Sequence, residues 1–253
     1  MERRKVIEVS NLTIGYDDFI ILENLNFQIY EKEVFIILGG SGCGKSTILK
    51  HMIGLYPPMS GEILINGLSM VKADDKGRKE ISRQFGVLYQ SGALFSSLTL
   101  EENIALPINE FTCLSESMIS AMAKLKLSLV GLEGFEHFCP HEISGGMKKR
   151  AGLARALALD PKILFFDEPS AGLDPISSAQ LDKLILELRD KLGCTMVIVT
   201  HELDSIFAIG DRAIIIDKEK KGIIEEGNPR EMKEKSLNNW VKKFLTRDSM
   251  KRN

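Results

Sequence analysis

The sequence predicts an α/β fold with a phosphate-binding loop in its core, a small antiparallel sheet before that loop and an inserted helical lobe. Three observations predict it. The apolar run 34–38 has the character of a buried strand, and it leads into the glycine-rich string GGSGCGKS and then into residues at helical spacing. Segment 91–159 has helical periodicity and no convincing strand, and strand character returns at 162–168.

The elements before the glycine-rich string are expected to be short strands joined by turns. Asp17 and Asp18 suit a turn, and apolar residues alternate with polar ones over 20–29. A small antiparallel sheet over the first 38 residues is therefore expected.

The elements after 168 continue the α/β pattern. Asp174 before Pro175 predicts the N-cap and first position of a helix that runs to about Lys191. A buried strand, a short helix ended by Gly210, a closing hairpin and a C-terminal helix are then expected. These last elements cover 196–200, 202–210, 213–217 with 222–227, and 229–247.

Composition excludes several classes of protein. The chain has 253 residues with 33 Lys and Arg against 35 Asp and Glu, so its net charge of −2 gives no global field for nucleic acid or an anionic bilayer. Its longest apolar runs are too short to cross a bilayer. The first residues, MERRKVIEVS, lack the apolar region of a signal peptide, so a cytoplasmic location is expected. The four scattered cysteines predict reduced thiols.

Gly39, Gly44, Lys45 and Ser46 satisfy the phosphate-loop pattern GxxxxGK[ST] between a buried strand and a helix. In such a loop, backbone amides and the helix dipole point at phosphate oxygens. Lys45 is expected to reach the β- and γ-phosphates of ATP, and Ser46 to bind Mg²⁺. The expected nucleotide-binding set is Gly39, Gly40, Ser41, Gly42, Cys43, Gly44, Lys45, Ser46 and Thr47.

The string ILFFDE places two carboxylates at the end of a buried strand. Asp167 is expected to hold Mg²⁺ through water, and Glu168 to polarise the water that attacks the γ-phosphate. Alone, an Asp-Glu pair after an apolar run is better explained as a solvated strand end. The phosphate loop in the same chain makes the catalytic interpretation the stronger one.

The string ISGGM contains a second possible anion site. Ser144 suits an N-cap, and the amides of Gly145 and Gly146 lie at the predicted start of a helix. One nucleotide does not need both sites of one chain. If the two sites lie far apart in the monomer, ATP is shared across a dimer. The alternative is an ordinary capped helix.

GGSGCGKS, ISGGM and ILFFDE, in this order and spacing, resemble the Walker A, signature and Walker B motifs of ABC ATPases. The resemblance implies a P-loop NTPase ABC-ATPase fold with a RecA-like core, and ATP hydrolysis with Mg²⁺. It also implies that Tyr16 stacks on adenine, that Gln90 is the Q-loop residue that senses Mg²⁺ and the attacking water, that Asp174 belongs to the D-loop, and that His201 is the switch histidine. Tyr16 as a turn residue, Gln90 as a polar strand end and His201 as a structural residue remain alternatives.

The expected organisation is one domain over 1–247. It consists of a β subdomain with the phosphate-loop core (1–90), a helical subdomain (91–160), a further core part (161–228) and a C-terminal helix (229–247), followed by a tail (248–253). Lys32 departs from the glycine that many ABC ATPases carry before Glu, a difference in a turn. Lys148, Lys149 and Arg150 are expected to form a solvated basic face, or else a phosphate or partner contact.

Met147, where ABC ATPases usually carry Gln or Glu, and the strings QSGALF and FLTRD resemble the ATPases of maintenance-of-lipid-asymmetry (Mla) and related MCE systems. That resemblance implies lipid transport by a homodimer on the cytoplasmic face of the inner membrane, with MlaE-like permease subunits, an MCE-domain protein and no nucleic acid. Leu94 and Phe95 are expected either to contact the permease or to belong to the core of the lobe. Another ABC importer and a soluble assembly ATPase remain alternatives.

Overall fold

Residues 3–246 are described by the structure, a computed structural model. The chain divides into two units. Unit 1 comprises 1–74 and 197–253, of which 3–74 and 197–246 are described, and unit 2 comprises 75–196. The predicted partition at residues 90, 160 and 228 stays a prediction. Within 3–246, no helix combines the length and apolarity needed to cross a membrane.

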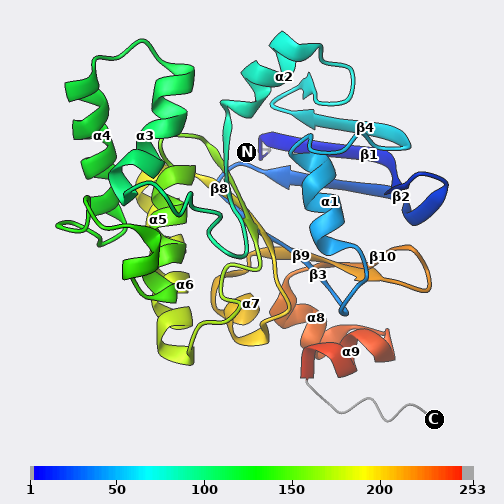
Figure 1. Cartoon of the computed structure of the whole chain (residues 1–253). Coiled ribbons are helices and arrows are strands. Elements are labelled where there is room, and N and C mark those ends of the chain that lie inside the picture. Colours follow the sequence, from blue (N-terminus) through cyan, green and yellow to red (C-terminus); the bar gives the residue numbers. More distant parts are fainter. Residues whose placement is uncertain (1–2, 247–253) are drawn as a thin grey trace. The chain divides into compact units, whose positions relative to one another are not determined.

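Unit 1 opens with an antiparallel sheet of strand order β2-β1-β4-β5. Its strands are β1 (Lys5–Tyr16), β2 (Phe19–Tyr30), β4 (Ser60–Ile65) and β5 (Leu68–Ser69). β1 and β2 form one long hairpin, with Asp17 and Asp18 between them, as predicted (Figure 1). The apolar side chains of Ile14, Leu22 and Leu25 are buried, and the predicted antiparallel sheet is present. The prediction was wrong in two respects: β1 and β2 are 12 residues long rather than short, and the sheet also includes β4 and β5, which follow the phosphate loop, but not 34–38.

Unit 1 also holds the strand that leads to the phosphate loop. β3 (Val34–Gly39) is buried along its whole length and pairs in parallel with β9 (Arg212–Asp217), which pairs antiparallel with β10 (Gly222–Gly227). β8 (Thr195–Val199) begins in unit 2 and ends in unit 1. Helices α1 (Lys45–Met52) and α7 (Leu203–Ile209, ended by Gly210) confirm the two predicted helices. The antiparallel pair of β9 and β10 confirms the predicted hairpin.

The prediction of one C-terminal helix over 229–247 is wrong. The structure has two helices, α8 (Pro229–Lys235) and α9 (Asn239–Thr246). The side-chain oxygen Oδ1 of Asn238 accepts a hydrogen bond from the backbone N–H of Trp240 at 3.0 Å, so Asn238 starts a new helix. Residue 247, the tail 248–253 and the end of FLTRD lie outside the described residues.

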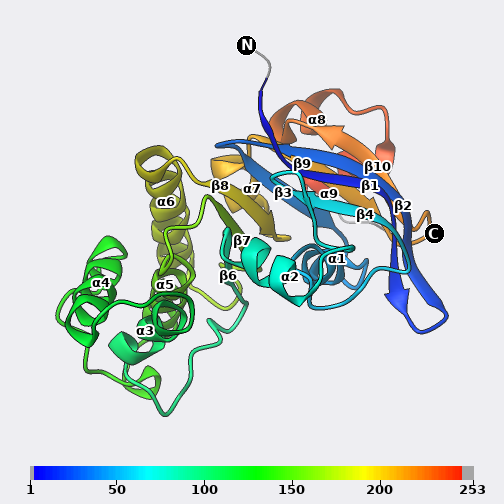
Figure 2. The same ribbon diagram turned by 90° about the horizontal axis from the view of Figure 1, so that it is seen from above.

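Unit 2 carries the helical lobe and two strands. Its elements are α2 (Asp75–Ser82), β6 (Phe85–Leu88), α3 (Leu100–Phe111), α4 (Glu116–Leu129), the 3₁₀ helix η1 (Pro140–Glu142), α5 (Gly145–Ala156), β7 (Ile163–Asp167) and α6 (Pro175–Leu192). β6 and β7 are parallel neighbours. α3, α4 and α5 pack together (Figures 1 and 2), which confirms the predicted helical character of 91–159.

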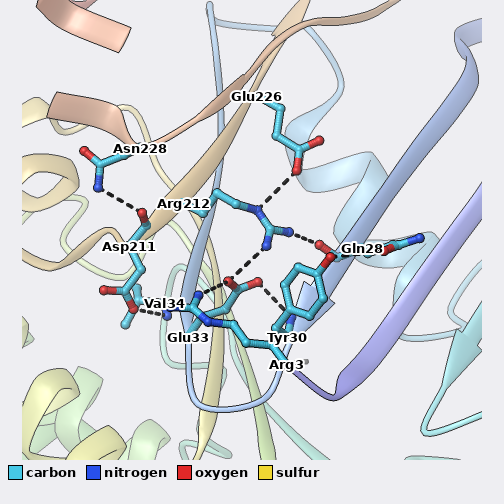
Figure 3. Close-up of polar contacts among 9 residues, drawn as sticks. All are labelled: Arg3, Gln28, Tyr30, Glu33, Val34, Asp211, Arg212, Glu226 and Asn228. Atoms are coloured by element: carbon cyan, nitrogen blue, oxygen red, sulfur yellow. Dashed lines mark hydrogen bonds and ion pairs between the residues drawn. The ribbon is translucent and has the colours of Figure 1, made fainter. Parts of the chain in front are cut away.

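A buried ion pair ties the edge of β2 to β3 and β9 within unit 1 (Figure 3). Glu33 is 3 % exposed, and its Oε2 lies 3.1 Å from Nη1 of Arg212. The Arg212 guanidinium also donates to the carbonyl of Gln28 and stacks over the rings of Tyr30 and Phe35. Burial raises the pKa of Glu33 more than Arg212 lowers it. The backbone N–H of Tyr30 and the Arg212 guanidinium thus offset only part of the effect of burial on this carboxyl.

Arg212→Met is expected to lower the free energy of unfolding by about 3–5 kcal/mol, because it removes the close cation of the buried Glu33 carboxylate and leaves only the exposed Arg3, whose Nη1 lies 3.9 Å from Oε2. Thermal and denaturant unfolding of the purified chain would measure this loss. Adding Glu33→Gln should restore part of it, since the stranded charge is then removed. A double variant no more stable than Arg212→Met would contradict the buried-charge explanation.

The turn before β3 explains the departure at Lys32. Lys32 adopts φ 63°, in the left-handed region that favours glycine. A glycine here would adopt this turn freely, whereas Lys32 adopts it at the expense of some backbone strain.

Candidate functional site

The phosphate loop in unit 1 connects β3 directly to α1. Gly42 and Gly44 have φ angles of 71° and 101°, which side chains disfavour. A Cβ on Gly44 would lie 2.9 Å from Cγ2 of Ile21 and 3.0 Å from Cδ1 of Leu22, so the loop packs closely on β2 there. A Cβ on Gly40 or Gly42 would meet nothing within 4 Å. The loop therefore has an open side that can admit phosphate groups.

Lys45 spans this loop. Its side chain is largely buried, and Nζ donates to the carbonyls of Gly39 and Gly40, each at 3.0 Å. Gly44, at the N-cap, brings no side chain to the first amides of α1. An ammonium group and a helix start at the same loop favour an anion of high charge density, as a triphosphate is.

Cys43 lies inside the loop with a buried thiol. Burial raises the pKa of this thiol, although the nearby Lys45 opposes the effect. The thiol therefore stays protonated and acts as a small packing group rather than a nucleophile.

Tyr16, the predicted adenine-stacking residue, lies at the end of β1 in the same unit and is 42 % exposed. Its ring meets that of Tyr56 nearly at right angles, with centroids 5.5 Å apart. The backbone carbonyl of Tyr56 accepts a hydrogen bond from Nδ1 of the buried His51 at 3.0 Å, and burial lowers the pKa of His51. Neutral His51 thus holds Tyr56, which in turn supports the ring of Tyr16.

His201 follows β8 in unit 1, the unit that carries the phosphate loop. The side chain is 56 % exposed, and Nε2 lies 3.7 Å from a carboxylate oxygen of Glu202. An exposed imidazole just beyond a strand is able to contact a ligand, as the switch-histidine assignment requires.

The carboxylates predicted to act in hydrolysis lie in unit 2. β7 is buried throughout and ends at Asp167. The sequence reasoning assumed that Glu168 belongs to the strand, and this is wrong. Glu168 follows the last strand residue with a φ angle of 49°. This left-handed conformation, which costs about 1–2 kcal/mol, changes the direction of the chain immediately after Asp167. Both carboxylates are largely buried.

The serine-glycine-glycine helix start is also in unit 2. Ser144 is the N-cap of α5, and its Oγ accepts from the backbone N–H of Met147 at 3.3 Å, as predicted. A Cβ on Gly145 would meet nothing within 4 Å. The first residue of this helix therefore has open space beside it.

Asp174 caps α6, as predicted. Its Oδ1 accepts from the backbone N–H groups of Ile176 and Ser177, each at 3.0 Å. The hydrogen bond from the Ser177 hydroxyl, followed by these backbone bonds, lowers the pKa of Asp174. The carboxylate is thus occupied by its own helix. A contact between Asp174 and nucleotide stays a prediction.

Gln90 is exposed and follows β6 in unit 2. Its backbone carbonyl accepts a hydrogen bond from Nζ of Lys149. Lys149 is only 6 % exposed, so the prediction that it belongs to a solvated basic face is wrong. Lys148 and Arg150 are half-buried, and Arg150 donates to Gln180 at 2.9 Å.

Sequence reasoning missed the residues that hold these segments in place. They are Tyr56, Asn103, Arg155 and Lys149, the last of which was named only as part of a basic face or a phosphate or partner contact. One signal could have found Lys149, because it lies three and four positions before Gly152 and Leu153, both buried in the same helix. Lysine on an apolar helix face needs a partner there.

The predicted site residues are divided between the two units. Unit 1 holds Tyr16, the loop 39–47 and His201, and unit 2 holds Gln90, Ser144–Gly146, Asp167, Glu168 and Asp174. A phosphate loop and a second open glycine-rich helix start in one chain are the combination expected of an ATP-driven cassette.

The comparisons with known proteins agree with this class. The family described as "ABC transporter" matches residues 22–171. MlaF of Haemophilus influenzae, named an intermembrane phospholipid transport system ATP-binding protein, is 41 % identical over 90 % of this chain and 86 % of its own. The "Probable ribonucleotide transport ATP-binding protein mkl" of Mycobacterium leprae is 44 % identical over 94 % of this chain and 68 % of its own.

A solved structure extends the agreement to the fold. The ATP-binding cassette MJ0796, described as a dimer in a post-hydrolysis state with ADP and Pi, is 30 % identical with a TM-score of 0.79, covering 88 % of this chain and 98 % of that one. This chain belongs to the ABC transporter family. It is an ATP-binding subunit, and it hydrolyses ATP.

Proposed function

We propose that this chain drives phospholipid transport between the inner membrane and the outer envelope, as the ATPase subunit of an ABC transporter. The similarity to MlaF, which extends over nearly the whole of both chains, carries this proposal. The subunit is proposed to lie on the cytoplasmic face of the inner membrane. Its partners are a second copy of itself, MlaE-like permease subunits and an MCE-domain protein.

Nucleotide binding is proposed to use the phosphate loop and Tyr16. The amides of Gly40 to Thr47 and the Lys45 ammonium would bind the phosphates, and the exposed ring of Tyr16 would stack on adenine. The open side of the loop at Gly40 and Gly42 supports this assignment. Ser46, Gln90 and Asp167 are proposed as oxygen ligands of Mg²⁺, which when bound would neutralise phosphate charge.

Hydrolysis is proposed to depend on Glu168 as general base. Its carboxylate would orient a water molecule and take up its proton, while Gln90 orients the same water and His201 contacts the γ-phosphate. Burial of Glu168 in a part of the protein with little water would strengthen its effect on the reacting water.

Ser144, Gly145 and Gly146 are proposed to bind the nucleotide held by the phosphate loop of a second copy. The open space at Gly145 supports this role, and the dimer described for MJ0796 shows that a similar cassette pairs with itself. Asp174 is proposed to lie at the same interface.

The segment after Gln90 is proposed to contact the permease. Phe95 is 57 % exposed and Leu94 is half-buried, so Phe95 is not part of the lobe core. Asn103, which is fully buried, holds the backbone beside it by accepting from Phe95 N–H at 2.8 Å and donating to the carbonyls of Phe95, Leu98 and Thr99. An apolar ring on a fixed backbone is suited to receiving a helix from a partner.

Cargo can be tested directly, because the mycobacterial Mkl relatives carry a name that refers to ribonucleotide transport. The complex isolated with its permease would be reconstituted in vesicles that contain either fluorescent phospholipid or enclosed ribonucleotides. ATP-dependent movement of phospholipid alone is expected. Movement of ribonucleotides alone would reject the lipid proposal, and copurification with a soluble partner instead of a permease would favour an assembly ATPase.

A further inference from the structure

Lys149 connects three segments of unit 2. It lies in the second turn of α5, the helix that begins at Ser144, and its side chain is buried. Nζ donates to the backbone carbonyl of Gln90 and lies 3.4 Å from the backbone carbonyl of Glu168. One ammonium group therefore bridges the segment after β6, the signature helix and the residue after β7.

Burying this ammonium group is unfavourable in itself. A lysine taken out of water loses several kcal/mol of hydration unless its donors find good acceptors. Burial lowers the pKa of Lys149, while the carboxylates of Glu168 and Asp167 oppose that effect. The acceptors that offset the loss are the backbone carbonyls of the two residues whose side chains are proposed to act on the attacking water.

The segment after Gln90 is attached to the same helix at further points. Arg155 donates from Nη1 to the carbonyl of Ala93 at 2.8 Å and from Nη2 to that of Gly92 at 3.2 Å. A Cβ on Gly152 would lie only 2.9 Å from the carbonyl oxygen of Gly92, so helix and loop are in close contact. The segment 90–93 and α5 are thus held together as one body, and Lys149 extends this connection to Glu168.

We propose that Lys149 is a positioning residue that fixes the backbones of Gln90 and Glu168 relative to each other, so that a displacement of segment 90–93 also displaces the Glu168 carboxylate. The direction of that carboxylate depends on the left-handed backbone at Glu168, whose carbonyl Lys149 contacts. The inference rests on the proposed role of Glu168 as general base. It adds a physical connection between the permease-contacting segment and hydrolysis.

The test uses the ATPase isolated with its permease. Lys149→Met keeps a long side chain but removes the charge and the donors, and it is expected to lower kcat about 10- to 100-fold through misplacement of the base. KM for ATP should change little, because Lys149 contacts backbone carbonyls and no proposed nucleotide group. Lys149→Arg should restore most of kcat, and Lys149→Gln, which can serve one carbonyl, should be intermediate. Lys148→Met is the matched control and should behave as wild type.

A second readout does not depend on turnover. Hydrogen–deuterium exchange of the nucleotide-free protein should be faster at 90–93 and 168–172 in Lys149→Met, and unchanged there in Lys148→Met. If Lys149→Met does not fold, the Arg and Gln variants carry the same comparison.

The outcomes separate this inference from the site assignment when Glu168→Gln is measured in parallel. Wild-type kcat and exchange in Lys149→Met, beside an inactive Glu168→Gln, would overturn the positioning role alone. A change in KM without a change in kcat in Lys149→Met would also overturn the positioning role. Full activity in Glu168→Gln would overturn the assignment of the base and with it the coupling to hydrolysis.

Discussion

Glu168→Gln is expected to leave ATP bound while lowering kcat by about 10²- to 10⁴-fold. Glutamine keeps the shape and hydrogen-bonding capacity of the side chain but cannot take up a proton from water. Because binding is retained and hydrolysis is not, a nucleotide-bound dimer should accumulate. Steady-state phosphate release would measure kcat, and size-exclusion chromatography with Mg-ATP would detect the dimer.

Glu187→Gln provides the matched control for this variant. Glu187 lies on α6 in the same unit, is 42 % exposed and pairs with Lys183 and Lys191, so its amide variant should keep wild-type kcat. Undiminished turnover in Glu168→Gln would exclude Glu168 as the base. Loss of turnover in both variants would instead indicate a general sensitivity of unit 2.

Lys45→Ala is expected to weaken ATP binding about 10- to 150-fold, since hydrogen bonds from a charged group contribute about 1.5–3 kcal/mol. The same change removes the donors that hold the carbonyls of Gly39 and Gly40, so the shape of the loop is affected along with its charge. Equilibrium binding of a fluorescent ATP analogue would give the dissociation constant without any contribution from hydrolysis.

Lys50→Ala is the control, because Lys50 lies further along the same helix and is not part of the proposed nucleotide site. Equal losses of affinity in both variants would show that helix α1, rather than the Lys45 contact, is responsible. Unchanged affinity in Lys45→Ala would remove Lys45 from the phosphate site.

The parts of the fold that were predictable are those fixed by local pattern. The run 34–38 became the buried strand β3, and the N-caps Ser144 and Asp174 begin α5 and α6 as predicted, because each depends on neighbouring residues alone. The break before α9 was not predicted. There the apolar spacing continues across a second cap at Asn238, and the cap determines where the helix begins.

The supporting residues of the site were harder to predict for a different reason. Lys149 stands in a string of basic residues that reads as solvated, and only the approach of the segments at Gln90 and Glu168 makes its burial favourable. The left-handed φ angle of Glu168 was equally hard to predict, since nothing in the string ILFFDE indicates it. The burial of Lys149 and the backbone of Glu168 depend on contacts between segments far apart in sequence. Such contacts cannot be inferred from a single sequence.

The burial of the thiol inside the phosphate loop has a practical consequence for labelling. Cysteine reagents attack the thiolate, and burial both raises the pKa of Cys43 and restricts access to it. Cys194 is buried with a raised pKa as well, whereas Cys113, between α3 and α4, is exposed. A maleimide dye added to the native protein should therefore attach first at Cys113, which places a reporter on the helical lobe and leaves the nucleotide loop chemically untouched.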